Sequence, residues 1–168
     1  MYRFLIWFLA VAISNKAFAQ SEWDSWNERY KEIEIPDLIS FEKQYADSVD
    51  RGLISGKHYM RMETYRFSAE FTGKQRDISD SIRSSMKRVY KIFGNPDQLH
   101  LFDEIKYEYQ FRIGKYLFWC SMQSVLDEPF KKEIKKGKSV YLYCLFLNEH
   151  NSQGSLINSF LISEFKRY

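Results

Sequence analysis

Strict alternation of apolar and polar residues in the second half of the chain is the feature that most limits its fold. From Ile105 to Ile113 every second residue is apolar, and polar or charged residues fill the positions between them. Because side chains along a strand point to opposite faces in turn, this period of two predicts a β-strand with one buried and one solvated face. The segment 65–71 shows the same period. We therefore expect a sheet that includes both segments.

Two later segments are apolar on both faces. Residues 116–123 and 140–147 carry aliphatic, aromatic or cysteine side chains at odd and even positions alike near their middle. A strand with one solvated face would alternate, so we expect other parts of the chain to cover the second face of these strands. A polar hairpin loop is predicted over 148–154 and a final strand over 156–165.

Helical periods precede and interrupt the strands. Apolar residues recur at helical spacing over 23–33 and again over 38–49, with Pro36 between the two runs. The apolar faces of these two amphipathic helices are the natural cover for the two-faced strands. Two further helices are predicted, one over 78–93 with Asp77 as its N-cap residue and one over 124–136.

These elements indicate an α+β fold. We expect an antiparallel five-stranded sheet, or an OB-like partly open barrel, with amphipathic helices packed on it. Apart from the helix at 78–93, the element order matches that of an OB fold, although an open sheet packed on helices would give the same pattern. We divide the chain into a signal peptide at 1–19, a helical segment at 20–57, and a β-rich domain at 58–168 that packs with the helical segment as one globular unit.

The N-terminus has the pattern of a secretory signal peptide. A basic start at Arg3 precedes the unbroken apolar run 4–13, and residues 17–19 form an Ala-x-Ala cleavage site before Gln20. As a helix, the apolar run would span only about 15 Å, which is about half of a membrane's hydrocarbon core. We therefore expect cleavage, a periplasmic or secreted protein, and no transmembrane anchor after cleavage.

Removing this segment changes the charge of the chain. The whole sequence has a net charge of +3, and residues 1–19 contain Arg3 and Lys16 but no acid, so residues 20–168 carry +1. A nearly neutral chain gives little reason to expect a nucleic-acid partner. The tyrosines and cations of 105–113 also alternate, so they point to opposite faces and do not form one surface for a single strand. We expect no nucleic-acid partner.

Cys120 and Cys144 are the two cysteines of the sequence, each in the middle of a predicted strand. An oxidising compartment permits a disulfide between them, which would close a loop of about 24 residues and stabilise the fold by roughly 3 kcal/mol. Two buried free thiols would fit the sequence as well. Their spacing is too wide for the close cysteine pair of a redox motif.

A run of five lysines lies near the end of the predicted helix 124–136. Such a cluster can bind phosphate groups, nucleic acid or anionic lipid. Positive charge at the C-terminal end of a helix also favours the helix dipole and keeps the surface solvated, so the run can be purely structural. The candidate anion-binding residues are Lys131, Lys132, Lys135, Lys136 and Lys138.

The sequence shows no specific motif for catalysis, cofactors or metals. His58, His100 and His150 are scattered over predicted loops and element ends, without the close pairs typical of metal sites. The chain also lacks a Gly-x-Ser-x-Gly elbow and a phosphate-binding Gly-x-x-x-x-Gly-Lys loop. We therefore expect no metal, no cofactor and no catalytic residues.

The expected function is binding. Small size, near neutrality and abundant aromatic residues favour an exported, non-enzymatic module that recognises another protein or an envelope component. An inhibitor or immunity-type protein is one concrete form of such a module. A structural or assembly factor of the cell envelope is one alternative, and a small exported hydrolase with a site assembled only in three dimensions is another.

Overall fold

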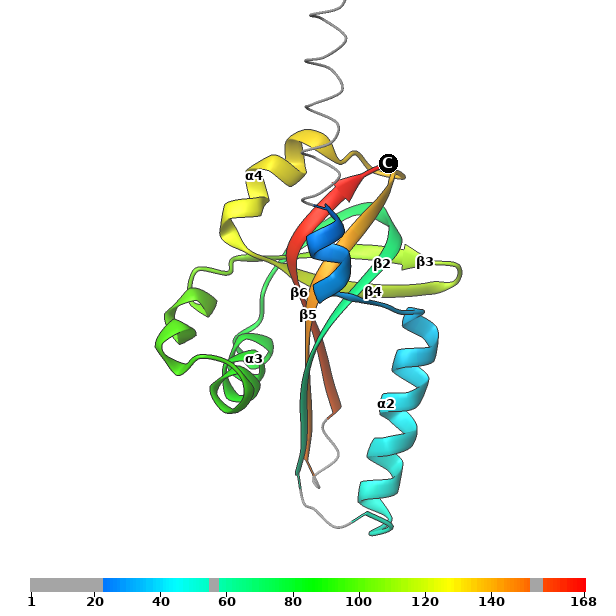
Figure 1. Ribbon diagram of the computed structural model, residues 1–168, viewed down its shortest axis with the longest axis vertical. Coiled ribbons are helices and arrows are strands. Elements are labelled where there is room, and N and C mark those ends of the chain that lie inside the picture. The colour runs from blue at the N-terminus through cyan, green and yellow to red at the C-terminus, as the bar shows by residue number, and fades with distance from the viewer. Residues whose placement is uncertain (1–22, 55–57, 152–155) are drawn as a thin grey trace, which may run out of the picture.

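The computed structural model describes residues 23–54, 58–151 and 156–168, which form an α+β fold (Figure 1). In this part of the chain the sheet is mixed and has six strands in the order β1-β2-β3-β4-β6-β5. Because β2 also pairs with β5, the strands from β2 to β6 close into a ring. The strands are β1 (Lys31–Glu32), β2 (His58–Asp77), β3 (Tyr107–Ile113), β4 (Tyr116–Met122), β5 (Ser139–Asn151) and β6 (Leu156–Arg167).

Helices lie on both sides of the strands. In Figure 1, α2 and α3 flank opposite sides of the long ribbon that β2, β5 and β6 form. The 3-10 helix η1 follows α3, and both belong to the connection between β2 and β3, whereas α4 connects β4 to β5. The helical elements are residues 23–29, α2 (Ile35–Asp50), α3 (Asp80–Phe93), η1 (Pro96–Phe102) and α4 (Ser124–Glu133).

The prediction of a five-stranded antiparallel sheet is wrong in two respects. Two strand pairs are parallel, β1 with β2 and β4 with β6, and β1 is a sixth strand. The helical period over 23–33 hides β1, because the helix ends at residue 29 and residues 31–32 then pair with Tyr65 and Arg66. β4 and β6 run parallel because α4 and the antiparallel strand β5 separate them along the chain.

The strands form a ring-like arrangement rather than the predicted OB-like barrel, and the ring closes because β2 is long and changes partner. Its residues 58–70 pair with β5, and its residues 70–77 pair with β3. The sequence predicts that this strand ends at Gly73, but Gly73 has a φ of 84° and lies at a shift of register, beyond which the strand continues. Glycine adopts this positive φ without strain. At the other end, β2, β5 and β6 extend beyond the ring as a ribbon (Figure 1).

The inner face of the ring holds the main core. Tyr109 and Phe111 of β3 are buried there, as their alternation with polar or charged residues predicts. Aromatic rings pack closely in this core: the centroid of Phe130 of α4 lies 5.0 Å from that of Tyr109 and 5.3 Å from that of Phe165. Aromatic side chains are large, so a small number of them fills the inside of the ring.

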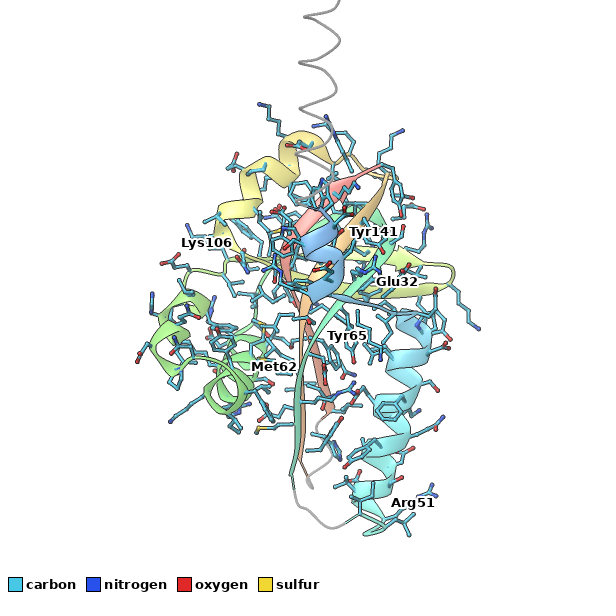
Figure 2. All side chains as sticks on the ribbon, in the orientation of Figure 1. Glu32, Arg51, Met62, Tyr65, Lys106 and Tyr141 are labelled. Atoms are coloured by element: carbon cyan, nitrogen blue, oxygen red, sulfur yellow. The ribbon has the colours of Figure 1, made fainter. Side chains whose placement is uncertain are left out.

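A second core lies on the opposite face of the ribbon, under α3 and η1. Met86 of α3 is fully buried there, in one cluster with Leu147 of β5. Figure 2 shows the division on β2, where Met62 lies on the side of α3 and Tyr65 on the side of α2. The prediction that the N-terminal helices cover this second face is therefore only partly right, because α2 packs on the main core through Ile35.

Polar contacts set the bounds of α3 and β5. Ser79, rather than the predicted Asp77, caps α3 by accepting a hydrogen bond from the backbone N–H of Ile82 at 3.3 Å. Arg88 of α3 donates two hydrogen bonds of 2.7 Å to the carboxylate of Glu149. Residues 148–151, predicted as a loop, remain in β5 because polar side chains there have partners of this kind.

Candidate functional site

Separate segments cover the outer face of β5. Tyr143 lies under the helical segment 23–29, with its ring centroid 5.6 Å from that of Trp23. Leu147 is fully buried under α3. Leu145 lies midway between them on the same face and is only half-buried. The surface of the sheet around Leu145 is therefore left open between two covers.

An apolar groove of about 390 Å³ lies over this opening, and we call it the outer groove. Its floor consists of Met62, Leu145 and Leu161, one residue from each strand of the ribbon. α3 and η1 supply one wall, Tyr30 supplies another, and the start of α4 closes a third side. The outer groove thus brings together segments that are far apart in the sequence.

The rim of the outer groove includes exposed apolar side chains. Leu101 of η1 is 47% exposed and Val125 of α4 is 75% exposed. On the side of the segment 23–29, burial raises the pKa of Tyr30, while a hydrogen bond with Ser163 lowers it by a smaller amount. Tyr30 is therefore a neutral part of the wall at physiological pH. A pocket of this size with apolar walls and few polar groups is typical of a binding site.

Hydrogen bonds and ring contacts fix the walls of the outer groove. The Ser124 hydroxyl donates to the backbone carbonyl of Glu104, which joins the start of α4 to the loop after η1. The Tyr90 hydroxyl donates to the side chain of Gln98 at 2.8 Å, and the Tyr90 ring lies 4.9 Å from that of Phe102. These contacts lie within the protein itself, so the outer groove is largely preformed.

The five candidate lysines do not act as one set. Lys131 donates to the carboxylate of Asp127 at 2.6 Å and lies 4.8 Å from the ring centroid of Tyr107, so its charge is already balanced. Asp127 also accepts a hydrogen bond from the hydroxyl of Tyr109, whose pKa is raised first by burial and then by this bond. The remaining four are exposed, and they are Lys132, Lys135, Lys136 and Lys138.

The end of α4 explains the place of these lysines. The helix stops at Glu133 rather than at the predicted residue 136, because Ile134 is extended and buried in the main core. Three of the lysines therefore lie in the loop that follows the helix, and Lys132 lies in its last turn. Their charge stabilises the helix dipole less than predicted, since that effect is confined to the last turn.

Cys120 and Cys144 come together in the main core. Both are free thiols in the structure, and both are fully buried. Burial raises the pKa of the Cys120 thiol, and a hydrogen bond with Cys144 raises it further. A thiol in such surroundings stays protonated and unreactive at neutral pH. The disulfide stays a prediction, which a mass measurement with and without reductant tests.

The three histidines lie in separate places. Nδ1 of His100 lies 2.9 Å from the backbone oxygen of Asp97, within η1. His150 belongs to β5 rather than to a loop, and its Nε2 lies 3.2 Å from the carboxylate of Asp50 at the end of α2. His58 begins β2. Within the described ranges, no group of three or more His, Cys, Asp or Glu residues could hold a metal ion.

Sequence reasoning missed the outer groove. Its floor residues look like ordinary strand residues, and Val125 looks like part of a helix core. The available signal was the apolar outer face of 140–147, which requires a second cover but does not say whether that cover is complete. The wall that η1 supplies could not be predicted, because the apolar residues after Pro96 show neither helical nor strand spacing.

Neither a known protein family nor a curated protein matches this chain. Among the described helices, none is long and apolar enough to cross a membrane. The predicted signal peptide, 1–19, lies outside the described residues. The function must therefore be inferred from the chemistry of the surface.

Proposed function

We propose that this protein is an exported binding module that holds an apolar segment of a partner protein in the outer groove. The half-buried Leu145 on the groove floor, beneath the exposed Leu101 and Val125 on the rim, is the observation that carries the proposal. Covering such surface removes apolar area from water, which contributes about 25 cal/mol for each Å². Exposed apolar surface around a hollow of this kind commonly marks an interaction site.

The exposed apolar surface extends beyond the hollow, which favours a protein partner over a small ligand. Ile92 and Phe93, at the end of α3, are 61% and 48% exposed, and Gly94 directly after them lines the outer groove. A small molecule inside the hollow would leave these side chains in water. A segment of a partner protein could place one side chain in the hollow and cover its surroundings with the rest.

Export rests on the sequence of residues 1–19. The basic start, the short apolar run and the Ala-x-Ala site support cleavage before Gln20 and work in the periplasm or outside the cell. In that compartment the partner is another exported protein or a protein of the envelope. The proposed activity is recognition without catalysis.

The connectivity of the ring supports a relation to OB folds. With β2 to β6 as strands one to five, the ring runs one, two, three, five, four and back to one, with α4 between the third and fourth strands. This is the strand order and helix position of an OB fold. OB folds often bind ligands with the loop between their first two strands. Here α3 and η1 occupy that connection and form a wall of the outer groove.

Affinity capture from an envelope extract tests the proposal with matched surface variants. The double variant Leu101→Glu with Val125→Glu places two charges on the rim, whereas Leu53→Glu with Leu117→Glu places them at exposed leucines elsewhere. All four positions are exposed, so both variants should fold. We expect the rim variant to lose the captured partner at least about tenfold, as for a hot spot. The control variant should retain it.

The identity of the captured protein then shows which kind of binding module this protein is. A secreted toxin or hydrolase would indicate an inhibitor or immunity-type protein, and an envelope protein would indicate an assembly factor. Equal retention by the rim variant and the control variant would overturn binding through the outer groove.

A further inference from the structure

One end of the molecule collects cations from three segments of the chain. The loop after α4 lies against the bend in β2, where it exchanges two backbone hydrogen bonds with Phe71. The Phe71 N–H donates to the Lys138 carbonyl at 3.0 Å, and the Gly137 N–H donates to the Phe71 carbonyl at 2.8 Å. The start of β5 pairs with the end of β6, with Val140 opposite Arg167. We call the resulting set the basic end: Lys74, Lys132, Lys135, Lys136, Lys138, Lys166 and Arg167.

The charges of the basic end are largely uncompensated. Among the described residues, none of the seven forms an ion pair, in contrast to Lys131 with Asp127 and Arg66 with Glu32. Exposed acids in the same region are Glu133 at the end of α4 and Glu32, which already pairs with Arg66. Since the whole chain has a net charge of only +3, the rest of the sequence is net acidic. The molecule therefore carries a charge asymmetry that would orient it toward an anionic surface.

A hollow of about 350 Å³ lies within the basic end. Lys166, Arg167, Arg66 and tyrosine side chains line it. Arg66 is already engaged, since it donates to the Tyr141 hydroxyl at 2.9 Å and pairs with Glu32 at 3.1 Å. Lys166 and Arg167 are the cations left to bind a ligand there.

Aromatic rings border these cations. The Lys166 Nζ lies 5.2 Å from the ring centroid of Trp23, which is partly exposed. Tyr168 is 78% exposed and lines the same hollow. Figure 2 shows Tyr141 near this end, beside the helical segment 23–29. Tryptophan and tyrosine beside lysine and arginine are the side chains that occupy the interface between a bilayer and water.

We propose that the basic end docks on a membrane surface that contains anionic lipids, with a lipid phosphate in the hollow that Lys166 and Arg167 line. Seven cations spread over one end, with exposed aromatic rings among them, fit a broad anionic surface better than a single soluble ion. The hollow at this end shares no lining residue with the outer groove. Membrane docking is thus independent of the proposed protein binding, and both can occur on one molecule.

Vesicle co-sedimentation of the full chain tests this docking. Vesicles of phosphatidylcholine, with and without the anionic lipid phosphatidylglycerol, are compared. Binding through the apolar segment 4–13 should occur on both kinds of vesicle, whereas binding through charge requires phosphatidylglycerol. We expect phosphatidylglycerol to strengthen binding, and NaCl raised from about 0.1 M to about 1 M to remove the gain, because the Debye length falls from about 10 Å to about 3 Å.

Two charge-reversal variants provide the matched comparison. Lys138→Glu with Arg167→Glu alters the basic end, and Lys43→Glu with Lys91→Glu makes the same change of net charge on exposed positions of α2 and α3. We expect the first variant to lose at least about tenfold in affinity for phosphatidylglycerol vesicles, and the second to lose about twofold at most.

Three outcomes would overturn the proposal. They are equal binding to both kinds of vesicle, equal losses in the two charge variants, and binding of inorganic phosphate to the wild type without any gain on phosphatidylglycerol vesicles. The rim variant Leu101→Glu with Val125→Glu should keep its vesicle binding. A failure at the outer groove is therefore distinguishable from a failure at the basic end.

Discussion

The two faces of β5 are similarly apolar, yet only one of them is sealed. On the inner face Leu142, Cys144 and Phe146 are completely buried, whereas on the outer face Leu147 is buried and Leu145 is only partly buried. A closed ring of strands encloses the inner face. Several separate segments cover the outer face, and the gap between them is the outer groove.

The difference shows that an apolar position and a closed core around it are separate properties. A strand pattern reports the first property, because it depends on the residues of the strand alone. Closure depends on how distant segments meet, and here they meet incompletely at Leu145. The incomplete face is where a partner can add the missing cover.

The largest expected effect is the difference in stability loss between an alanine substitution at Phe146 and one at Leu145. Phe146→Ala should lower the free energy of unfolding by about 3–5 kcal/mol, because it leaves a cavity in a fully enclosed site. Leu145→Ala should lower it by only about 1 kcal/mol, because part of that side chain is already in contact with water and its loss opens no enclosed cavity. Equilibrium urea unfolding of the two variants measures both changes.

The slope of the unfolding transition is the control for this comparison. It should be the same in both variants, since a changed slope would indicate a changed denatured state or an intermediate. Equal losses of stability in the two variants would mean that the outer face around Leu145 is as closed as the inner face.

The next effect concerns the attachment of the outer cover. Arg88→Met removes both hydrogen bonds that Arg88 donates to Glu149, a side chain that is 8% exposed, and so takes a positive charge away from a nearly buried carboxylate. Because Arg88 itself is 53% exposed, solvent reduces the loss of stability to about 1–2 kcal/mol. The double variant with Glu149→Gln should recover part of that loss. A double-variant loss equal to the sum of the two single losses would show that this pair does not hold α3 on the ribbon.

The smallest effect is a pH dependence on the inner side of the ribbon. Glu42 of α2 is fully buried beside Arg61, and burial raises its pKa above the ordinary 4.5 more than Arg61 and Tyr59 lower it. The native state therefore binds a proton before the unfolded state does as the pH falls. As the pH falls from neutral to about 4.5, the free energy of unfolding of the wild type should therefore rise relative to that of Glu42→Gln. Unfolding at a series of pH values measures the difference, and a relative loss would mean that Arg61 lowers the pKa of Glu42 overall.

Much of the fold could be predicted from periodicity. The alternation from Ile105 to Ile113 marks β3 and its buried face, and the stripe over 78–93 marks α3 to within two residues. The errors have local causes. β1 is hidden because Ile33 extends a helical period beyond the helix, and β2 continues past Gly73 because glycine permits a bend within a strand.

The candidate site was less predictable than the fold. The lysines of 131–138 stand out in the sequence, but the structure pairs Lys131 with Asp127 and brings Lys166 and Arg167, from the other end of the β-rich region, close to the rest. No sequence pattern reports such convergence. The outer groove could not be predicted for the same reason, because its floor and its walls come from six helices and strands together with Tyr30.

Photo-crosslinking in the living host tests most directly whether a partner occupies the outer groove. A photoreactive amino acid replaces Val125 on the rim of the outer groove in one version of the full chain and the exposed Leu53 in another. We expect a specific crosslinked partner protein from position 125 and none from position 53. No crosslinked partner from position 125, or the same crosslinked species from both positions, would contradict binding through the outer groove.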